Sequence, residues 1–171
     1  MKEAVAQLNA VSRTVETYRA EMSRLASQLP EYETVMGLYG AGDSTGSQLM
    51  AEIGDIRRFT HQKSLVSFAG ADPVKNESGD SKPKSAKASK RGSSYLRKTL
   101  FVVMSVLLQK KPADNPVYQF LDKKRSEGKP FYVYMTAGSA KFLRIYYGKV
   151  RDCLQEKGLW NKETSNPVKP C

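Results

Sequence analysis

Histidine, cysteine and acidic side chains are scarce in this sequence. Its 171 residues include one histidine, two cysteines and 17 acidic residues, against 28 lysines and arginines. The single histidine and the distant Cys153 and Cys171 do not have the ligand spacing of a zinc site, so we expect no metal site in this chain. Two cysteines also do not make a disulfide framework, which favours a reducing compartment, and the predicted location is the cytoplasm.

Long hydrophobic runs are missing as well. No window approaches 18 apolar residues, so we expect no transmembrane helix and no membrane partner. The first residues, Met1-Lys2-Glu3, lead into a charged stretch without the apolar region of a signal peptide. Apolar residues make up 40% of the chain. This length and composition suit one domain with a core and an appended element.

Basic charge is present in excess and is concentrated between Lys75 and Lys98. These 24 residues contain eight lysines and arginines and two acidic residues, so they carry +6 of the net charge of +11. Charge at this density cannot be buried, and it repels itself unless a polyanion is present. Residues 71–92, which we call the basic segment, have almost no large apolar side chains and are predicted to form a loop ordered by a ligand. We therefore predict that the chain binds nucleic acid.

The rest of the sequence has helical periodicity and no convincing strand, so we predict an all-α fold. The predicted organisation is a long coiled-coil-like helix over residues 1–30, a helical domain over 31–160 that contains the basic segment, and a flexible tail over 161–171. Residues 1–29 carry a heptad seam that Pro30 ends. The seam fits either packing on the same domain or a coiled coil that dimerises or spaces two domains. Its members are Leu8, Val11, Val15, Tyr18, Met22, Leu25 and Leu29.

Several helix boundaries can be predicted inside the domain. The Gly40-Ala41-Gly42 turn between two helices is typical of a helix-hairpin-helix module, whose backbone N–H groups bind phosphate, although an ordinary turn explains it too. Asp43 would face such a phosphate unfavourably unless it acts as a helix N-cap. We expect Thr60 to cap one helix and Ser93 or Ser94 to cap the most apolar one. The last helix is expected to run from about residue 132 to 157.

Four segments occur in an order that is similar to a known family. They are Leu38–Gly42 (LYGAG), Leu49–Phe59 (LMAEIGDIRRF), Leu65–Pro73 (LVSFAGADP), and Ser78-Gly79 followed by SKRG at 89–92 and YLRKTL at 95–100. In this order they resemble the C-terminal domain of the DEDD transposases of "IS-one-ten" type insertion sequences, relatives of the pilin-gene invertase. The likeness spans about residues 36–105, and a looser one around Gly128 and Arg144 extends it to about 155.

The resemblance implies that two halves of a transposase have different roles. In that family, an N-terminal RuvC-like domain holds acidic residues and magnesium, a helical C-terminal domain supplies a serine that joins to DNA, and a structured guide RNA bridges donor and target. The resemblance implies that Ser78 is the nucleophile and that residues 1–29 match the helix linking the halves. The acidic domain has no counterpart in this sequence. We therefore expect an excised domain or a truncated protein, with no cofactor in this chain and magnesium in the absent RuvC-like domain.

The residues around Ser78 suit attack on a phosphodiester. Fixed cations stabilise the charge that develops on the phosphate oxygens, and Gly79 lets the backbone approach closely. No general base is evident nearby, since Glu77 and Asp80 indicate no relay, and a solvated loop serine or a role for Ser81 stays open. We predict contacts to nucleic acid, mostly to phosphates, from Lys75, Gly79, Lys82, Lys84, Lys87, Lys90, Arg91, Arg97 and Lys98.

Two functions follow from these patterns. The first is the C-terminal half of a DNA transposase or recombinase of an insertion sequence, with DNA and a structured guide RNA as partners, which forms homo-oligomers through residues 1–29 and is inactive alone. The alternative is a truncated, non-catalytic module for nucleic-acid binding and oligomerisation. A group of aromatic residues fits either base stacking or the core: Phe131, Tyr132, Tyr134, Tyr146 and Tyr147.

Overall fold

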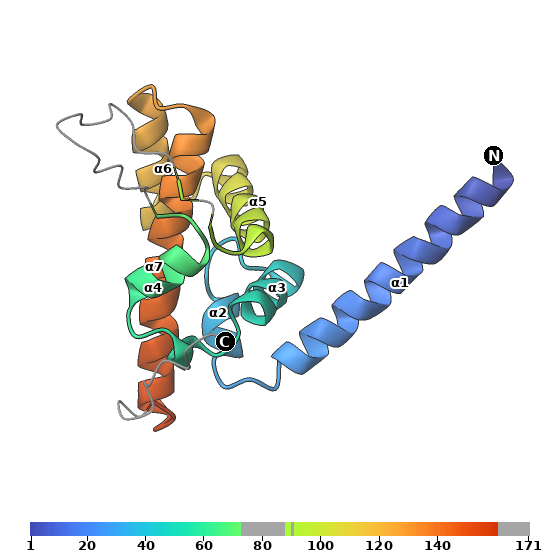
Figure 1. The fold of residues 1–171 in the computed structure, drawn as a ribbon, viewed down its shortest axis with the longest axis horizontal. Helices are drawn as coiled ribbons and strands as arrows, with labels where there is room; N and C mark the ends of the chain where they lie inside the picture. Colours follow the sequence, from blue (N-terminus) through green and yellow to red (C-terminus); the bar gives the residue numbers. More distant parts are fainter. Residues whose placement is uncertain (73–87, 90, 161–171) are drawn as a thin grey trace.

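The computed structural model describes residues 1–72, 88–89 and 91–160, and it confirms the predicted all-α fold (Figure 1). No β-strand occurs within these ranges. The longest helices are α1 and α7, and the others form a bundle with α7. The helices are α1 (Lys2–Ala26), α2 (Tyr32–Met36), α3 (Asp43–Ile53), the 3-10 helix η1 (Ile56–Arg58), α4 (Gln62–Phe68), α5 (Ser94–Lys110), α6 (Pro116–Ser126) and α7 (Phe131–Glu156).

Helix α1 projects away from the bundle, and only its last turns contact the rest of the chain (Figure 1). Ala26 is buried, and the Ser23 hydroxyl donates to the carbonyl oxygen of Asp43 at 3.4 Å and accepts from the Ser47 hydroxyl at 3.3 Å. Six of the seven heptad positions are exposed, with exposed fractions from 41% at Val15 to 71% at Tyr18. The seam is therefore uncovered along the helix.

Helix α1 ends at Ala26, three residues before the predicted end. The backbone N–H of Gln28 bonds to Leu25 and that of Leu29 bonds to Ala26, so tight turns replace the last helical turn. The physical reason is steric, because the ring of Pro30 disfavours helical geometry in the preceding residue. Leu29 thus lies outside the helix and is no longer aligned with the other heptad residues.

The core lies where α3, α5, α6 and α7 pack together. The helix predicted to be the most apolar is α5, and its Leu100, Val103, Met104 and Leu107 are fully buried. The turn between α2 and α3 packs on the same helix: a Cβ on Gly40 would lie 2.9 Å from Cγ1 of Val103. The Gly-x-Gly turn therefore packs against α5 at Gly40, whereas Gly42 is exposed.

The helix caps differ from the expected ones by a residue at two places. Gly42, not Asp43, is the N-cap of α3, and Asp43 becomes its first helical residue, where a carboxylate interacts favourably with the helix dipole. His61, not Thr60, caps α4, because its Nδ1 accepts from the backbone N–H of Ser64 at 3.1 Å. Ser93 caps α5 by accepting from the backbone N–H of Leu96.

The five aromatic residues of α7 that fit either base stacking or the core separate into two groups. Tyr146 and Tyr147 lie in the core, and the Tyr147 hydroxyl donates to the carbonyl oxygen of Phe59 at 3.0 Å. Phe131 and Tyr132 are exposed at the start of the helix, and Tyr134 is half-buried. Only the first turn of α7 therefore presents aromatic rings to solvent.

Candidate nucleic-acid interface

The two ends of the basic segment are joined by hydrogen bonds in the structure. The backbone N–H of Ser93 donates to the carbonyl oxygen of Phe68 at 2.8 Å, and that of Ser89 donates to Asp72 at 2.9 Å. The Ser89 hydroxyl also donates to the Asp72 carboxylate at 2.6 Å. We call this paired region, residues 68–72 with 89 and 91–93, the stem. It brings together the third and fourth segments of the family likeness.

Arg97 ties the stem to the start of α5. Its Nη1 donates to the carbonyl oxygen of Ala69 at 2.9 Å and to that of Gly92 at 3.0 Å, so one guanidinium bonds both sides of the stem. Arg97 is half-buried, in contrast to the neighbouring Lys98. The residue predicted from its charge to contact nucleic acid thus also has a positioning role within the protein.

Gly92 allows the two sides of the stem to approach. A Cβ at this position would lie 2.0 Å from the carbonyl oxygen of Phe68 and 2.5 Å from the backbone nitrogen of Gly70. Both contacts are with backbone atoms, which cannot rotate away as a side chain can. The glycine of the Ser-Lys-Arg-Gly sequence is therefore a packing requirement of the stem.

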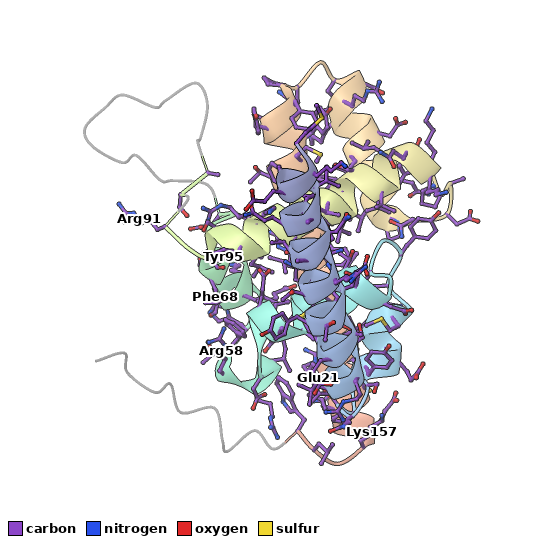
Figure 2. All side chains as sticks on the ribbon, turned by 90° about the vertical axis from the view of Figure 1, so that its right-hand side faces the viewer. Glu21, Arg58, Phe68, Arg91, Tyr95 and Lys157 are labelled. Atoms are coloured by element: carbon purple, nitrogen blue, oxygen red, sulfur yellow. The ribbon has the colours of Figure 1, made fainter. Side chains whose placement is uncertain are left out.

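The predicted site residues divide between the described and undescribed parts of the chain. Arg91 and Lys98 are exposed. Arg91 lies in the stem (Figure 2), and Arg97 and Lys98 lie near the start of α5. Because Arg97 bonds both sides of the stem, these three cations lie on the stem and on the adjoining start of α5. The other predicted residues lie outside the described residues: Lys75, Ser78, Gly79, Lys82, Lys84, Lys87 and Lys90.

Arg58 is a further cation beside the stem that the sequence patterns did not single out. Its guanidinium carbon lies 4.4 Å from the ring centre of Phe68 and 4.6 Å from that of Phe59. The two rings pack on one another with centres 5.4 Å apart. The only signal in the sequence was Arg58 next to Phe59, with Phe68 nine positions later. Such a pattern is too common to identify a cluster of this kind.

The carboxylate nearest to Arg58 along the chain is occupied by another arginine. Asp55 accepts from Nε of Arg57 at 2.9 and 3.0 Å and pairs with its Nη2 at 2.9 Å. These hydrogen bonds from Arg57 hold the pKa of the Asp55 carboxyl below its ordinary value. Asp55 therefore remains ionised at neutral pH, and its hydrogen-bonding oxygens face Arg57.

A polar contact in the interior joins the second and fourth family segments. Oε1 of Glu52 accepts from the Thr99 hydroxyl at 2.9 Å and from Nε2 of Gln48 at 2.9 Å. Thr99 is almost fully buried, so this bond links α3 to the first turns of α5 beneath the stem. The helix that begins after the stem is thus joined to α3 by a side-chain hydrogen bond.

The described residues offer no cluster of three histidine, cysteine, aspartate or glutamate side chains that suits a metal ion. Cys153 is a free thiol. None of the described helices combines the length and the apolar character that crossing a membrane requires. No described part of the chain thus resembles the magnesium site that the family resemblance implies for the acidic half.

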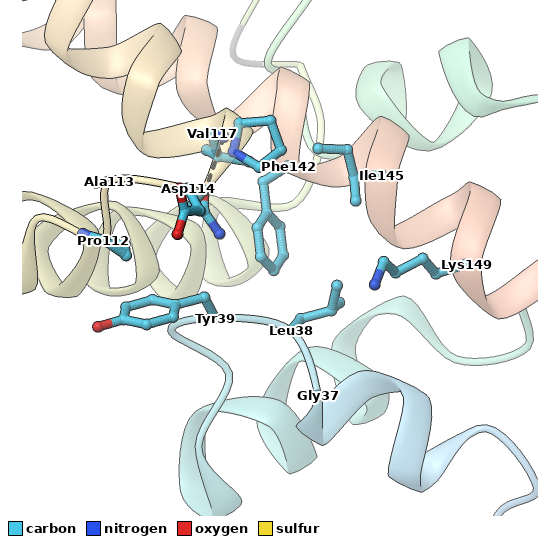
Figure 3. Close-up of a pocket in the computed structure, with 12 residues that line it drawn as sticks. Gly37, Leu38, Tyr39, Pro112, Ala113, Asp114, Val117, Phe142, Ile145 and Lys149 are labelled. Carbon is cyan, nitrogen blue, oxygen red and sulfur yellow. Dashed lines mark hydrogen bonds between the residues drawn. The ribbon is translucent and has the colours of Figure 1, made fainter.

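One pocket of about 400 Å³ is lined by residues other than those of the stem (Figure 3). It is lined by residues 37–39 of the turn after α2, residues 112–117 and the side chains of Phe142, Ile145 and Lys149. Phe142 points into it, and the Asn115 cap of α6 lies at its wall. Arg91, Arg97 and Lys98 do not line this pocket, and its walls hold no serine, cysteine or histidine.

Comparison with known proteins identifies the family. A model of the Transposase IS116/IS110/IS902 family matches residues 32–119, just over half of the chain. The matched range begins at α2, includes the stem and the basic segment, and ends in α6. No curated protein matches the chain. The shared range includes all four segments of the likeness described above, and the chain therefore belongs to the IS116/IS110/IS902 family of transposases.

Proposed function

We propose that this chain is the C-terminal, DNA-binding half of an insertion-sequence transposase, and that Ser78 is its nucleophile for DNA strand cleavage and exchange. The observation that carries the proposal is the stem. The stem closes the basic segment at its base, so that the segment containing Ser78 starts and ends on a supported part of the fold. Since phosphates are bound mainly by cations, the clustered lysines are the expected DNA contacts.

The proposed reaction has two balanced steps. Ser78 Oγ attacks the phosphorus, an Oγ–P bond forms, the P–O bond to one sugar breaks, and the serine proton ends on the leaving sugar oxygen. A sugar hydroxyl from another strand then attacks the phosphoserine ester, which restores the serine and joins the new strand. Cations beside the phosphate stabilise the charge of both transition states.

The partners of the reaction follow from the family. We place magnesium and the activation of the serine in a RuvC-like acidic half outside this chain, and a structured guide RNA as the bridge between donor and target. The described residues contain no metal-binding cluster, so no step of the reaction is assigned to a metal in this chain. The compartment that suits this reaction is the cytoplasm. The Gly-x-Gly turn is a weaker phosphate site than the stem because Gly40 packs on α5.

We also propose that α1 forms a coiled coil with another α1. Its heptad seam is exposed in the single chain, and an apolar stripe of this kind is stabilised when a second helix covers it. This proposal also suits the alternative function, a non-catalytic module that binds nucleic acid and oligomerises.

The nucleophile is tested in the transposase that combines this chain with its acidic half. Ser78→Ala should abolish both strand exchange and the covalent protein–DNA adduct seen on a denaturing gel, while DNA affinity stays within a few-fold. Ser81→Ala is the matched control and should keep both activities. An adduct that persists in Ser78→Ala would mean that another side chain attacks, and loss of the adduct in Ser81→Ala alone would assign that serine.

A further inference from the structure

Among the described residues, Arg58 forms no ion pair. Asp55 bonds Arg57 instead, and Arg58 is exposed. A guanidinium in this state keeps its charge and its donors available to an anion.

The aromatic rings hold Arg58 in place. Its guanidinium lies over two rings, those of Phe59 and Phe68, with Phe59 buried in the core. Stacking uses the face of the planar guanidinium and leaves the N–H groups at its edge free. The side chain therefore loses less freedom on binding a phosphate than a lysine on a flexible stem would lose, and its N–H groups match two phosphate oxygens.

The position of Arg58 relates it to the stem. Phe68, which it covers, accepts the backbone N–H of Ser93 at 2.8 Å, and the next residue accepts from Arg97. Figure 2 shows Arg58, Phe68, Tyr95 and Arg91 along the same edge of the molecule. A phosphate at this edge would lie beside the root of the basic segment.

We propose that Arg58, held over Phe59 and Phe68, binds a backbone phosphate of the DNA that the basic segment engages. This inference rests on the DNA binding proposed above. The ligand is one phosphodiester of duplex DNA, and the contact is independent of base sequence because phosphates carry no sequence information. Arg58 would extend the binding surface from the stem to η1.

The test measures fluorescence anisotropy of the full chain with a labelled DNA duplex over a salt series. Arg58→Gln should weaken binding several-fold for duplexes of unrelated sequence and lower the salt slope by about one. Arg57→Gln is the matched control, because it removes one positive charge from the same element. The Arg57 guanidinium is already paired with Asp55, so the DNA affinity and salt slope of this variant should stay close to those of the unaltered chain. Equal effects of the two variants would overturn the proposal in favour of a general charge effect.

Two further results separate the possible failures. An unaltered chain that binds no duplex at low salt would overturn the proposed DNA binding itself, before Arg58 is considered. An Arg58→Gln effect on a structured RNA hairpin, with duplex binding unchanged, would overturn the assignment to DNA. If circular dichroism shows that Arg58→Gln is unfolded, Arg58→Lys is used in its place. Arg58→Lys should keep the salt slope of the unaltered chain and bind the duplex more weakly than Arg57→Lys does. Equal affinities of these two lysine variants would overturn the proposal.

Discussion

At the scale of single residues, the stem depends on one glycine and one arginine. Gly92 lets the backbone of the second side approach Phe68, and Arg97 bonds a carbonyl on each side. A half-buried arginine that binds carbonyl oxygens replaces the hydrogen bonds that water would otherwise supply. The local sequence thus uses one cation of the Leu-Arg-Lys run inside the protein and leaves the next, Lys98, exposed.

Gly92→Ala should destabilise the chain and open the stem. The added Cβ would meet fixed backbone atoms, so the two sides must separate, and we expect a loss of about 1–3 kcal/mol in the free energy of unfolding. Gly148→Ala is the control, because its Cβ meets nothing within 4 Å in α7 and should stabilise by about 0.5–1 kcal/mol. Urea denaturation measures the free energy of unfolding of both variants. Equal stabilities of the two variants would contradict the close backbone approach at Gly92.

Tyr146 should make the chain sensitive to alkaline pH. Its side chain is 2% exposed, and burial raises the pKa of the phenol, with a smaller contribution from Glu31. Above about pH 10 the unfolded chain ionises this tyrosine while the folded chain does not, so stability falls as the pH rises. Thermal denaturation between neutral and strongly alkaline pH should show a smaller fall in Tyr146→Phe.

The control for this pH effect is Tyr18→Phe on the exposed helix α1. Tyr18 is 71% exposed and is not part of the buried core. The substitution is expected to leave the alkaline fall unchanged. A fall that is the same in both variants would assign the alkaline sensitivity to other groups.

At the scale of secondary structure elements, α1 is the helix whose apolar seam is exposed in the single chain. An isolated helix gains little stability from its own hydrogen bonds, and packing of an apolar face supplies most of it. Only the end of α1 packs on α3. The rest of its seam therefore favours association with a second helix.

Paired acidic substitutions test this association. Leu8→Asp with Val15→Asp places charges in the seam and should convert the chain to a monomer in sedimentation experiments, because buried unpaired carboxylates are costly. Ala6→Asp with Ala20→Asp adds the same charge on the opposite face of α1 and should leave the mass unchanged. A monomeric unaltered chain would exclude the coiled coil.

Helix positions could largely be predicted from sequence, whereas their ends could not. The period of apolar residues defined α5 and α7 to within a residue or so, since burial of one face determines where such residues recur. The caps at Gly42 and His61 and the end of α1 at Ala26 depend on which backbone groups find partners. Those choices are close in energy and are decided by the surrounding turns.

At the scale of the whole molecule, the net charge of +11 is unevenly distributed. Eight of the 28 lysines and arginines lie between Lys75 and Lys98 in the sequence, and Arg91 lies at one edge of the described structure (Figure 2). A field of one sign concentrated in this way attracts a polyanion and speeds its association, and salt weakens both effects.

The salt dependence of DNA binding tests this charge distribution. Replacing Lys84, Lys87 and Lys90 by alanine should weaken binding to all sequences and reduce the salt slope by about three. Replacing Lys110, Lys123 and Lys129, which are exposed outside the basic segment, removes the same charge and should change the slope little. Fluorescence anisotropy over a salt series distinguishes the two, and matching slopes would contradict a phosphate role for the basic segment.

The sequence by itself determined the all-α class, the basic segment and the family, because helical periodicity, charge density and the order of four short motifs are properties of neighbouring residues. Only the tertiary structure decided that Asp72 meets Ser89, that Arg97 bonds both sides of the stem, that Arg58 lies over Phe68, and that the α1 seam is left uncovered. The physical reason is that these contacts join residues from different elements or depend on which faces remain unpacked. They arise from the packing of the whole bundle, which local propensity does not specify.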